Sequence, residues 1–128
     1  MAIRIFDPTK IVWIATFTIL GEPASKANSR VFGRDKDGTR RSFKSPKANK
    51  YVRDFVLQCP KLVPLLDYDL IIAMKIFYAS RRPDLDESLI LDAMQGRIYT
   101  NDRLVKERHT YWALDKNNPR TSILVARL

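Results

Sequence analysis

Residues 68–95 decide the fold: Tyr68-Asp-Leu-Ile-Ile-Ala-Met-Lys-Ile-Phe-Tyr-Ala79, then Ser80-Arg-Arg-Pro-Asp-Leu-Asp86, then Glu87-Ser-Leu-Ile-Leu-Asp-Ala-Met-Gln95. The first part is mostly apolar and rich in β-branched and aromatic residues, interrupted only by Asp69 and Lys75, and it predicts a strand. The second part contains proline and charged residues and predicts a break in regular structure. The third part predicts a short helix, because Gly96 stands where a left-handed residue commonly ends a helix.

The rest of the chain extends this pattern in both directions. The run Ile11–Leu20 predicts a strand that is buried on both faces for much of its length. Residues 24–44 lack periodicity and predict a long loop or an extended hairpin. Further elements are expected as a helix from Ser45-Pro46 to about Gln58, a short extended piece over 97–100, and strands over 104–114 and 121–127 joined by a turn over 115–119. The order β-α-β-α-β-β predicts one α+β domain over residues 1–128, with two helices packed on a mixed sheet.

The charge of the chain is strongly positive and concentrated in one stretch. The 128 residues include 23 Lys and Arg against 14 Asp and Glu, a net charge of +9. Ten basic and only two acidic residues lie between Lys26 and Arg53. A basic patch of this kind is typical of a protein that binds nucleic-acid phosphates, although surface charge that only aids solubility remains an alternative. The residues expected to contact DNA are Lys26, Arg30, Arg34, Arg40, Arg41 and Lys44 in the basic loop, with Arg81 and Arg82 beyond it.

Other features limit the compartment. Cys59 is the single cysteine, which excludes an internal disulfide and a cysteine-based metal site. No apolar run approaches the roughly 20 residues of a membrane span, and the first residues have no signal-peptide pattern. We therefore expect a protein of the cytoplasm that does not associate with membranes.

Acidic residues cluster where the predicted strand gives way to the helix. Asp84, Asp86 and Glu87 lie within four residues, and Asp84 and Asp86 project on the same side of an extended segment. Asp102 follows the helix, and because the helix forms an out-and-back excursion of the chain, we expect Asp102 to return beside them. Gathered carboxylates repel one another unless a cation lies among them, and magnesium prefers such oxygen ligands. The same acids also suit the first turn of a helix as caps, so both interpretations stay open.

The motifs together resemble one known family. Arg82-Pro-Asp-Leu-Asp86, Leu91-Asp-Ala-Met94 and Tyr99-x-Asn-Asp-Arg103 follow one another in the order found in Holliday junction resolvases of the RusA type. The opening Phe17-Thr-Ile-x-Gly21-x-Pro23-x-x-Lys26 and the later Ser45-Pro-Lys-x-x-x-Tyr51 are similar to the start of that family. The resemblance spans roughly residues 15–110.

The resemblance implies a homodimeric endonuclease that resolves four-way DNA junctions with Mg²⁺, or with Mn²⁺ as a substitute. It assigns the metal-binding, catalytic carboxylates to Asp84, Asp86 and Asp102. The chain departs from the family in the 87–95 helix, where the family lysine is missing, so Lys106 or Arg103 is the expected replacement and Glu87 a possible additional ligand.

Two rival functions explain part of the pattern. A non-catalytic protein that binds DNA or RNA accounts for the charge but gives the three aspartates no role. A restriction-like nuclease ranks third, because no acidic-x-Lys pair follows Pro83-Asp84 at a suitable position. His109, the single histidine, is expected to lie on a surface or interface strand rather than to act as a general base.

Overall fold

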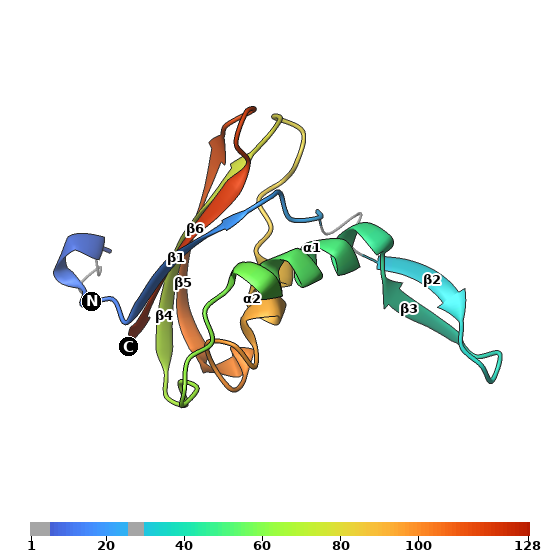
Figure 1. Ribbon diagram of the computed structural model, residues 1–128, viewed down its shortest axis with the longest axis horizontal. Coiled ribbons are helices and arrows are strands. Elements are labelled where there is room, and N and C mark those ends of the chain that lie inside the picture. The colour runs from blue at the N-terminus through green and yellow to red at the C-terminus, as the bar shows by residue number, and fades with distance from the viewer. Residues whose placement is uncertain (1–5, 26–29) are drawn as a thin grey trace, which may run out of the picture.

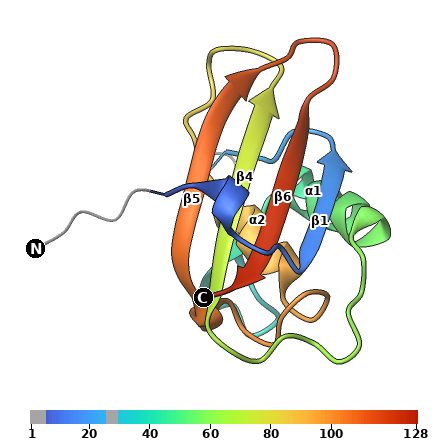
Figure 2. The same ribbon diagram turned by 90° about the vertical axis from the view of Figure 1, so that its left-hand side faces the viewer.

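The protein is an α+β domain built on a four-stranded mixed sheet, as predicted. The structure is a computed structural model that describes residues 6–25 and 30–128. The strands β1 (Ala15–Leu20), β4 (Leu70–Tyr78), β5 (Val105–Leu114) and β6 (Arg120–Arg127) lie in the order β1-β6-β4-β5. Only β4 and β5 run parallel, and the other neighbours are antiparallel. Figure 2 shows β4 and β6 in the middle of this sheet.

Both helices pack on one face of the sheet (Figure 1). The helix α1 (Pro46–Gln58) begins as predicted, since the Ser45 side chain accepts a hydrogen bond from the Ala48 N–H at 3.1 Å. The shorter α2 (Ser88–Met94) ends just before Gly96, whose φ of 78° confirms the expected left-handed residue. The core contains Phe55 and Tyr51 of α1, Ile90 and Met94 of α2, and Ile72, Ile76, Ile19 and Ile123 of the sheet.

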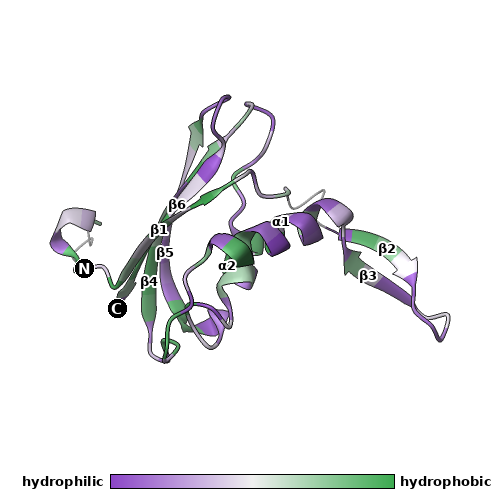
Figure 3. Ribbon diagram, viewed as in Figure 1, coloured by the Kyte–Doolittle hydropathy of each residue, from purple (hydrophilic) through white to green (hydrophobic). Residues whose placement is uncertain are grey.

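The central strand β4 is the apolar strand of Figure 3, and its prediction is confirmed. The prediction for β1 was wrong in two respects. This strand begins at Ala15 rather than at Ile11, and Val12 before it is 89% exposed. It also lies at the edge of the sheet with burial that alternates along it, so it is covered on one face only. A short 3₁₀ turn, η1 (Pro8–Lys10), precedes it.

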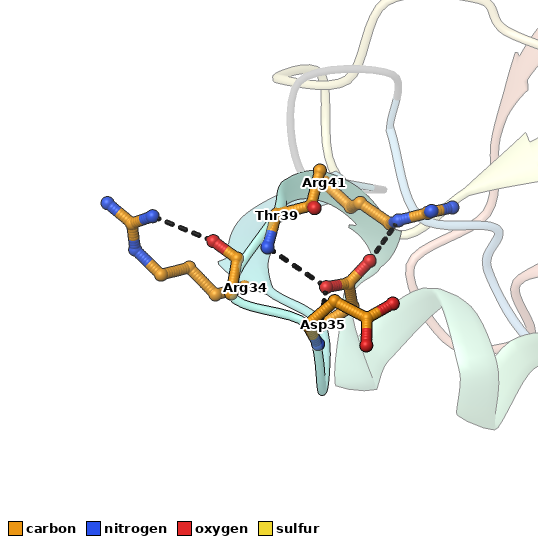
Figure 4. Close-up of polar contacts among 6 residues, drawn as sticks. Arg34, Asp35, Thr39 and Arg41 are labelled. Carbon is orange, nitrogen blue, oxygen red and sulfur yellow. Dashed lines mark hydrogen bonds and ion pairs between the residues drawn. The ribbon is translucent and has the colours of Figure 1, made fainter.

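The basic stretch forms a hairpin of β2 (Arg30–Arg34) and β3 (Arg40–Lys44), which extends away from the sheet beyond the start of α1 (Figure 1). Of the two predicted alternatives, the extended hairpin is thus the correct one. Asp35 organises its turn, because one carboxylate oxygen accepts the N–H groups of Asp37 and Thr39 at 3.0 Å each. Gly38 adopts the positive φ of 78° that this turn requires. Figure 4 shows Asp35 between Thr39 and Arg41.

The connection from β4 through α2 to β5 is a crossover between parallel strands. Such strands need a connection that carries the chain back along the sheet, here a loop and α2. The start of β5 lies beside the start of β4, since Val105 pairs with Leu70. Residues 96–98 form a turn rather than the predicted extended piece. After this turn, η3 (Asp102–Leu104) leads into β5.

Candidate functional site

A cleft of about 660 Å³ lies where the acidic loop passes the end of β1 and the start of α1. Its lining includes four acidic residues, Glu22, Asp84, Asp86 and Glu87, and three basic ones, Lys47, Arg82 and Arg108. The remaining lining residues are Pro23, Ser25, Pro83, Leu85 and Ser88. The cleft therefore combines carboxylates with groups that attract phosphate.

Two aromatic side chains fix the acidic loop. The Tyr78 hydroxyl donates a hydrogen bond to the Asp84 carbonyl at 3.2 Å and accepts one from the Asp86 N–H at 3.3 Å. The Trp112 indole N–H donates to the Pro83 carbonyl at 3.1 Å, and its ring stacks on Tyr78 with centroids 5.8 Å apart. Burial raises the pKa of Tyr78, so its hydroxyl keeps its proton at neutral pH. The backbone on both sides of Leu85 is thereby tied to the sheet.

The four carboxylates of the cleft differ in what holds them. Asp84 is exposed, and its carboxylate has no hydrogen-bond or ion-pair partner within residues 6–25 and 30–128. Glu22 accepts a hydrogen bond from the Ala79 N–H at 3.2 Å, which ties the end of β1 to the end of β4. Glu87 pairs with Arg108 at 3.2 Å. Asp84 is thus the carboxylate best placed to take a new ligand.

Asp86 supports the capping interpretation in part. One of its oxygens accepts hydrogen bonds from the Ser88 N–H at 3.1 Å and from the Ser88 hydroxyl at 2.7 Å. Glu87 occupies the N-cap position of α2 but makes no capping hydrogen bond with its side chain. Asp86 therefore stabilises the start of α2 through one oxygen, and its other oxygen has no such role.

The expectation that Asp102 returns beside Asp84 and Asp86 is wrong. The Asp102 N–H donates to the Gln95 side chain at 2.7 Å, which places Asp102 at the C-terminal end of α2, whereas Asp86 lies at the N-terminal end. Seven helical residues rise about 10 Å, and Asp102 does not line the cleft. Among the described residues, no three Asp, Glu, His or Cys side chains form a group that could hold a metal ion. The physical reason is the crossover between parallel strands. The acidic loop follows the end of β4, whereas β5 starts beside the start of β4. The connection through α2 therefore carries the chain away from the acidic loop before it reaches Asp102.

Asp102 has a structural environment of its own. Burial raises the pKa of the neighbouring Tyr99, and the negative charge of Asp102 raises it further. The Tyr99 hydroxyl donates to the Leu91 carbonyl at 2.5 Å inside the core. Asp102 also begins η3, where Asn101 accepts the Arg103 N–H at 2.9 Å.

The basic residues of the cleft are not those expected to replace the family lysine. Lys106 and Arg103 are exposed, and neither lines the cleft. Lys47 of α1 and Arg108 of β5 do line it. His109 lies outside the cleft as expected, where its ring stacks on Phe6 at 3.6 Å.

The predicted DNA-contacting residues divide into two locations. Arg30, Arg34, Arg40, Arg41 and Lys44 all lie on the β2–β3 hairpin. Arg82 lines the cleft, whereas Arg81 is exposed outside it. Lys26 lies outside the described residues.

Glu22, Lys47 and Arg108 are the cleft residues that sequence reasoning missed. Lys47 follows the helix cap at Ser45-Pro46, so its position near the N-terminus of α1 was predictable. The closeness of Lys47 to the acidic loop was not predictable, because the whole of β4 separates the two segments in the sequence. Glu22 lies inside the Gly21-x-Pro23 motif, and that motif is the signal in the sequence that could have identified it.

Comparison with models of known protein families gives no match, and comparison with curated proteins gives none either. The resemblance to the RusA family therefore rests on the residues quoted above. In the described part of the chain, no helix is both long and apolar enough to cross a membrane.

Proposed function

We propose that this protein is an endonuclease that cuts branched DNA, in particular four-way junctions, by metal-dependent hydrolysis of a phosphodiester bond. The proposal rests above all on the position of Asp84 and Asp86, which lie in an open cleft that Lys47, at the start of α1, also lines. The ordered motifs shared with RusA-type resolvases support the same activity. The cytoplasm of a bacterial or phage-infected cell is the proposed location.

The donors of the cleft suit Mg²⁺, or Mn²⁺ in its place, at Asp84 and Asp86 alone. Mg²⁺ keeps several waters and usually takes one or two protein carboxylates together with substrate phosphates. The three-carboxylate site that includes Asp102 does not fit the observed separation. Asp84 and Asp86 would hold the ion, which would supply polarisation of the scissile phosphate and activation of a water.

Charge within the cleft also favours a cation. Four acidic and three basic lining residues give the cleft a formal net charge of −1, in a chain of net charge +9. A phosphate gains little in such a cleft, because the carboxylates oppose its charge. One divalent ion reverses the sign to +1. Binding of the scissile phosphate is therefore expected to depend on the ion.

The residues of the chain then have distinct roles. Lys47 and Arg108 contact the oxygens of the phosphate in the cleft, and the hairpin holds a neighbouring DNA arm by its phosphates. Tyr78 and Trp112 are positioning residues, since they hold the loop that carries the aspartates. Two symmetric cuts in a junction call for two such clefts, which a homodimer with two-fold symmetry supplies.

The second candidate is a DNA-binding protein without catalytic activity. One observation favours it: Asp102 lies at the far end of α2, and the described residues contain no group of three metal-binding side chains. In this case the basic hairpin is the functional surface, and the acidic loop only begins α2.

A labelled four-way junction incubated with and without Mg²⁺ separates the two candidates. A nuclease gives symmetric nicks that depend on Mg²⁺, whereas a binding protein shifts the junction and leaves it intact. We expect Asp84→Asn to abolish cleavage while junction binding is kept or tightened, because one carboxylate fewer repels the DNA. Asp69→Asn, an exposed aspartate beside the start of β4, serves as the matched control and should cut normally.

Asp102→Asn decides the extent of the catalytic centre. Cleavage that survives in Asp102→Asn confines the centre to Asp84 and Asp86. If the Asp102→Asn variant is folded but does not cut, Asp102 belongs to the catalytic centre, as the family resemblance predicts. Light scattering at micromolar concentration should give the mass of a dimer, and a monomer would contradict the two-cleft proposal.

A further inference from the structure

The strand register separates the β2–β3 hairpin into two chemically different faces. Residues directly opposite each other in an antiparallel pair point to the same side, and the side alternates along each strand. The pairs Arg30–Lys44, Phe32–Ser42 and Arg34–Arg40 share one side. We name this set of six residues the Phe32 face. The pairs Val31–Phe43 and Gly33–Arg41 share the other side.

The Phe32 face presents an aromatic ring to solvent among cations. Phe32 is 72% exposed, which makes it the most exposed large hydrophobic residue of the hairpin. The guanidinium of Arg40 lies over its ring at 5.2 Å from the centroid. On the opposite face, Val31 and Phe43 are less exposed, at 44% and 40%. An exposed ring with a guanidinium above it is the arrangement on which nucleobases stack.

The cations of this face are free to bind an anion. Arg30 donates to the Ser42 hydroxyl at 3.1 Å, and Arg34 donates to the Gly38 carbonyl at 2.8 Å, so both are oriented by neutral acceptors. In the described part of the chain, only Lys44 of this face lies near a carboxylate, that of Asp92 at 4.0 Å. Arg41 on the other face differs, because it forms an ion pair with Asp35.

We infer that the Phe32 face binds unpaired bases of DNA, with Phe32 stacked on a base and Arg30, Arg34 and Arg40 on the flanking phosphates. Base stacking on an aromatic side chain tolerates any sequence, since every base has a π-face. A fully paired duplex hides its bases from such a ring, whereas a bulge or an opened branch point leaves base faces accessible. The inference rests on the proposed function only in taking the bound nucleic acid to be DNA. It makes the Phe32 face the part of the protein that distinguishes branched from linear DNA.

The charge of the face argues against a second copy of the chain as its occupant. Two such faces would bring eight basic residues together around two phenyl rings, and like charges repel at this range. A DNA strand meets the same residues with phosphates of opposite sign. Contact between the aromatic ring and a base, rather than with another protein, follows from this complementarity.

The test measures DNA affinity in EDTA, where cleavage does not interfere, by fluorescence anisotropy at constant salt. The substrates are a fully paired duplex, the same duplex with a bulge of unpaired nucleotides, and a four-way junction. Phe32→Ala is expected to lower affinity for the bulged duplex about tenfold, the order of one lost base stack, and to leave affinity for the paired duplex within about twofold, because the phosphate contacts remain. Phe32→Trp should restore the preference, and Phe43→Ala on the opposite face is the matched control.

Each other outcome overturns the inference. Equal losses of affinity for paired and bulged DNA would show that Phe32 only stabilises the hairpin. No loss of affinity for either substrate would show that Phe32 does not contact the DNA. A fall of the mass in light scattering on Phe32→Ala would identify the face as a contact between copies. Failure of the proposed function is read separately, from the absence of Mg²⁺-dependent junction cleavage by the wild-type protein, because the binding measurement requires no catalysis.

Discussion

The substitution Tyr78→Phe tests whether the acidic loop is held by a single buried hydroxyl. Tyr78 is 1% exposed, and its hydroxyl serves the backbone of both Asp84 and Asp86. Phenylalanine fills the same space without the hydroxyl, so the change removes two hydrogen bonds and little packing. Each such bond contributes about 1 kcal/mol, which predicts a loss of about 2 kcal/mol in the free energy of unfolding.

The expected loss in the free energy of unfolding corresponds to a measurable decrease in the melting temperature, Tm. Unfolding entropy amounts to about 2.1 cal/mol/K per residue, or on the order of 270 cal/mol/K for this chain by the same principle. A loss of about 2 kcal/mol then lowers Tm by about 7 °C. Calorimetry or circular dichroism measures this shift, and Tyr111→Phe is the matched control. Tyr111 is 49% exposed, and its hydroxyl has no hydrogen-bond partner in the described residues. The Tm of the Tyr111→Phe variant should therefore stay within about 1 °C of the wild type.

The same variant connects stability to the proposed activity. A loop that is released from Tyr78 no longer holds Asp84 and Asp86 in one arrangement, so junction cleavage should fall far more than junction affinity. A Tm for Tyr78→Phe within 2 °C of the wild type would refute the reasoning, since the loop would then be held by other contacts. Unchanged cleavage alongside the lower Tm would show that the loop position does not matter to the reaction.

Three further outcomes are expected. Lys47→Ala should slow junction cleavage at least about tenfold with little change in Tm, because one charge-assisted phosphate contact is worth about 1.5–3 kcal/mol; Lys50→Ala, a surface lysine of the same helix, should cut normally. Cys59 should resist a thiol reagent at pH 8 in the folded protein and react fully in denaturant, because burial raises its pKa to about 11 and leaves about 100-fold less thiolate than an exposed cysteine; rapid labelling of the native protein would contradict this. Ser45→Ala should lower the stability by about 1 kcal/mol, since the Ala48 N–H loses its cap, whereas Ser45→Asp should keep most of it.

Local signals in the sequence predicted the elements well. The Ser45-Pro46 cap, the apolar run of β4 and Gly96 each act within a few residues, so the chain chemistry near them decides the outcome. The error in β1 has the opposite origin. Residues 11–14 are apolar enough for a strand, but β1 pairs with β6 only, and that pairing begins at Ala15 opposite Val125 although β6 continues to Arg127.

The candidate site was predictable only where it is local. Asp84 and Asp86 share a cleft because they share a loop, which the sequence displays directly. The position of Asp102 depends on whether β5 runs parallel or antiparallel to β4, and no residue near 102 encodes that direction. Lys47 and Arg108 enter the cleft from two other elements, so their contribution depends on packing between segments far apart in the chain.

On the proposed function, the ion pair between Arg108 and Glu87 can rearrange when a phosphate of the DNA enters the cleft. The pair is partly exposed, at 50% and 23% for the two side chains, and pairs of this kind contribute only about 0–1 kcal/mol to stability. Arg108 therefore loses little when it exchanges the Glu87 carboxylate for a phosphate. The exchange leaves Glu87 without a counter-charge beside Asp86, which raises the affinity of the cleft for a divalent ion as the phosphate arrives. On the proposed function, metal and DNA should thus bind cooperatively. Glu87→Gln should weaken that coupling, measured with Asp84 and Asp86 intact as the difference in junction affinity with Mg²⁺ and with EDTA, by stopped-flow binding before cleavage sets in.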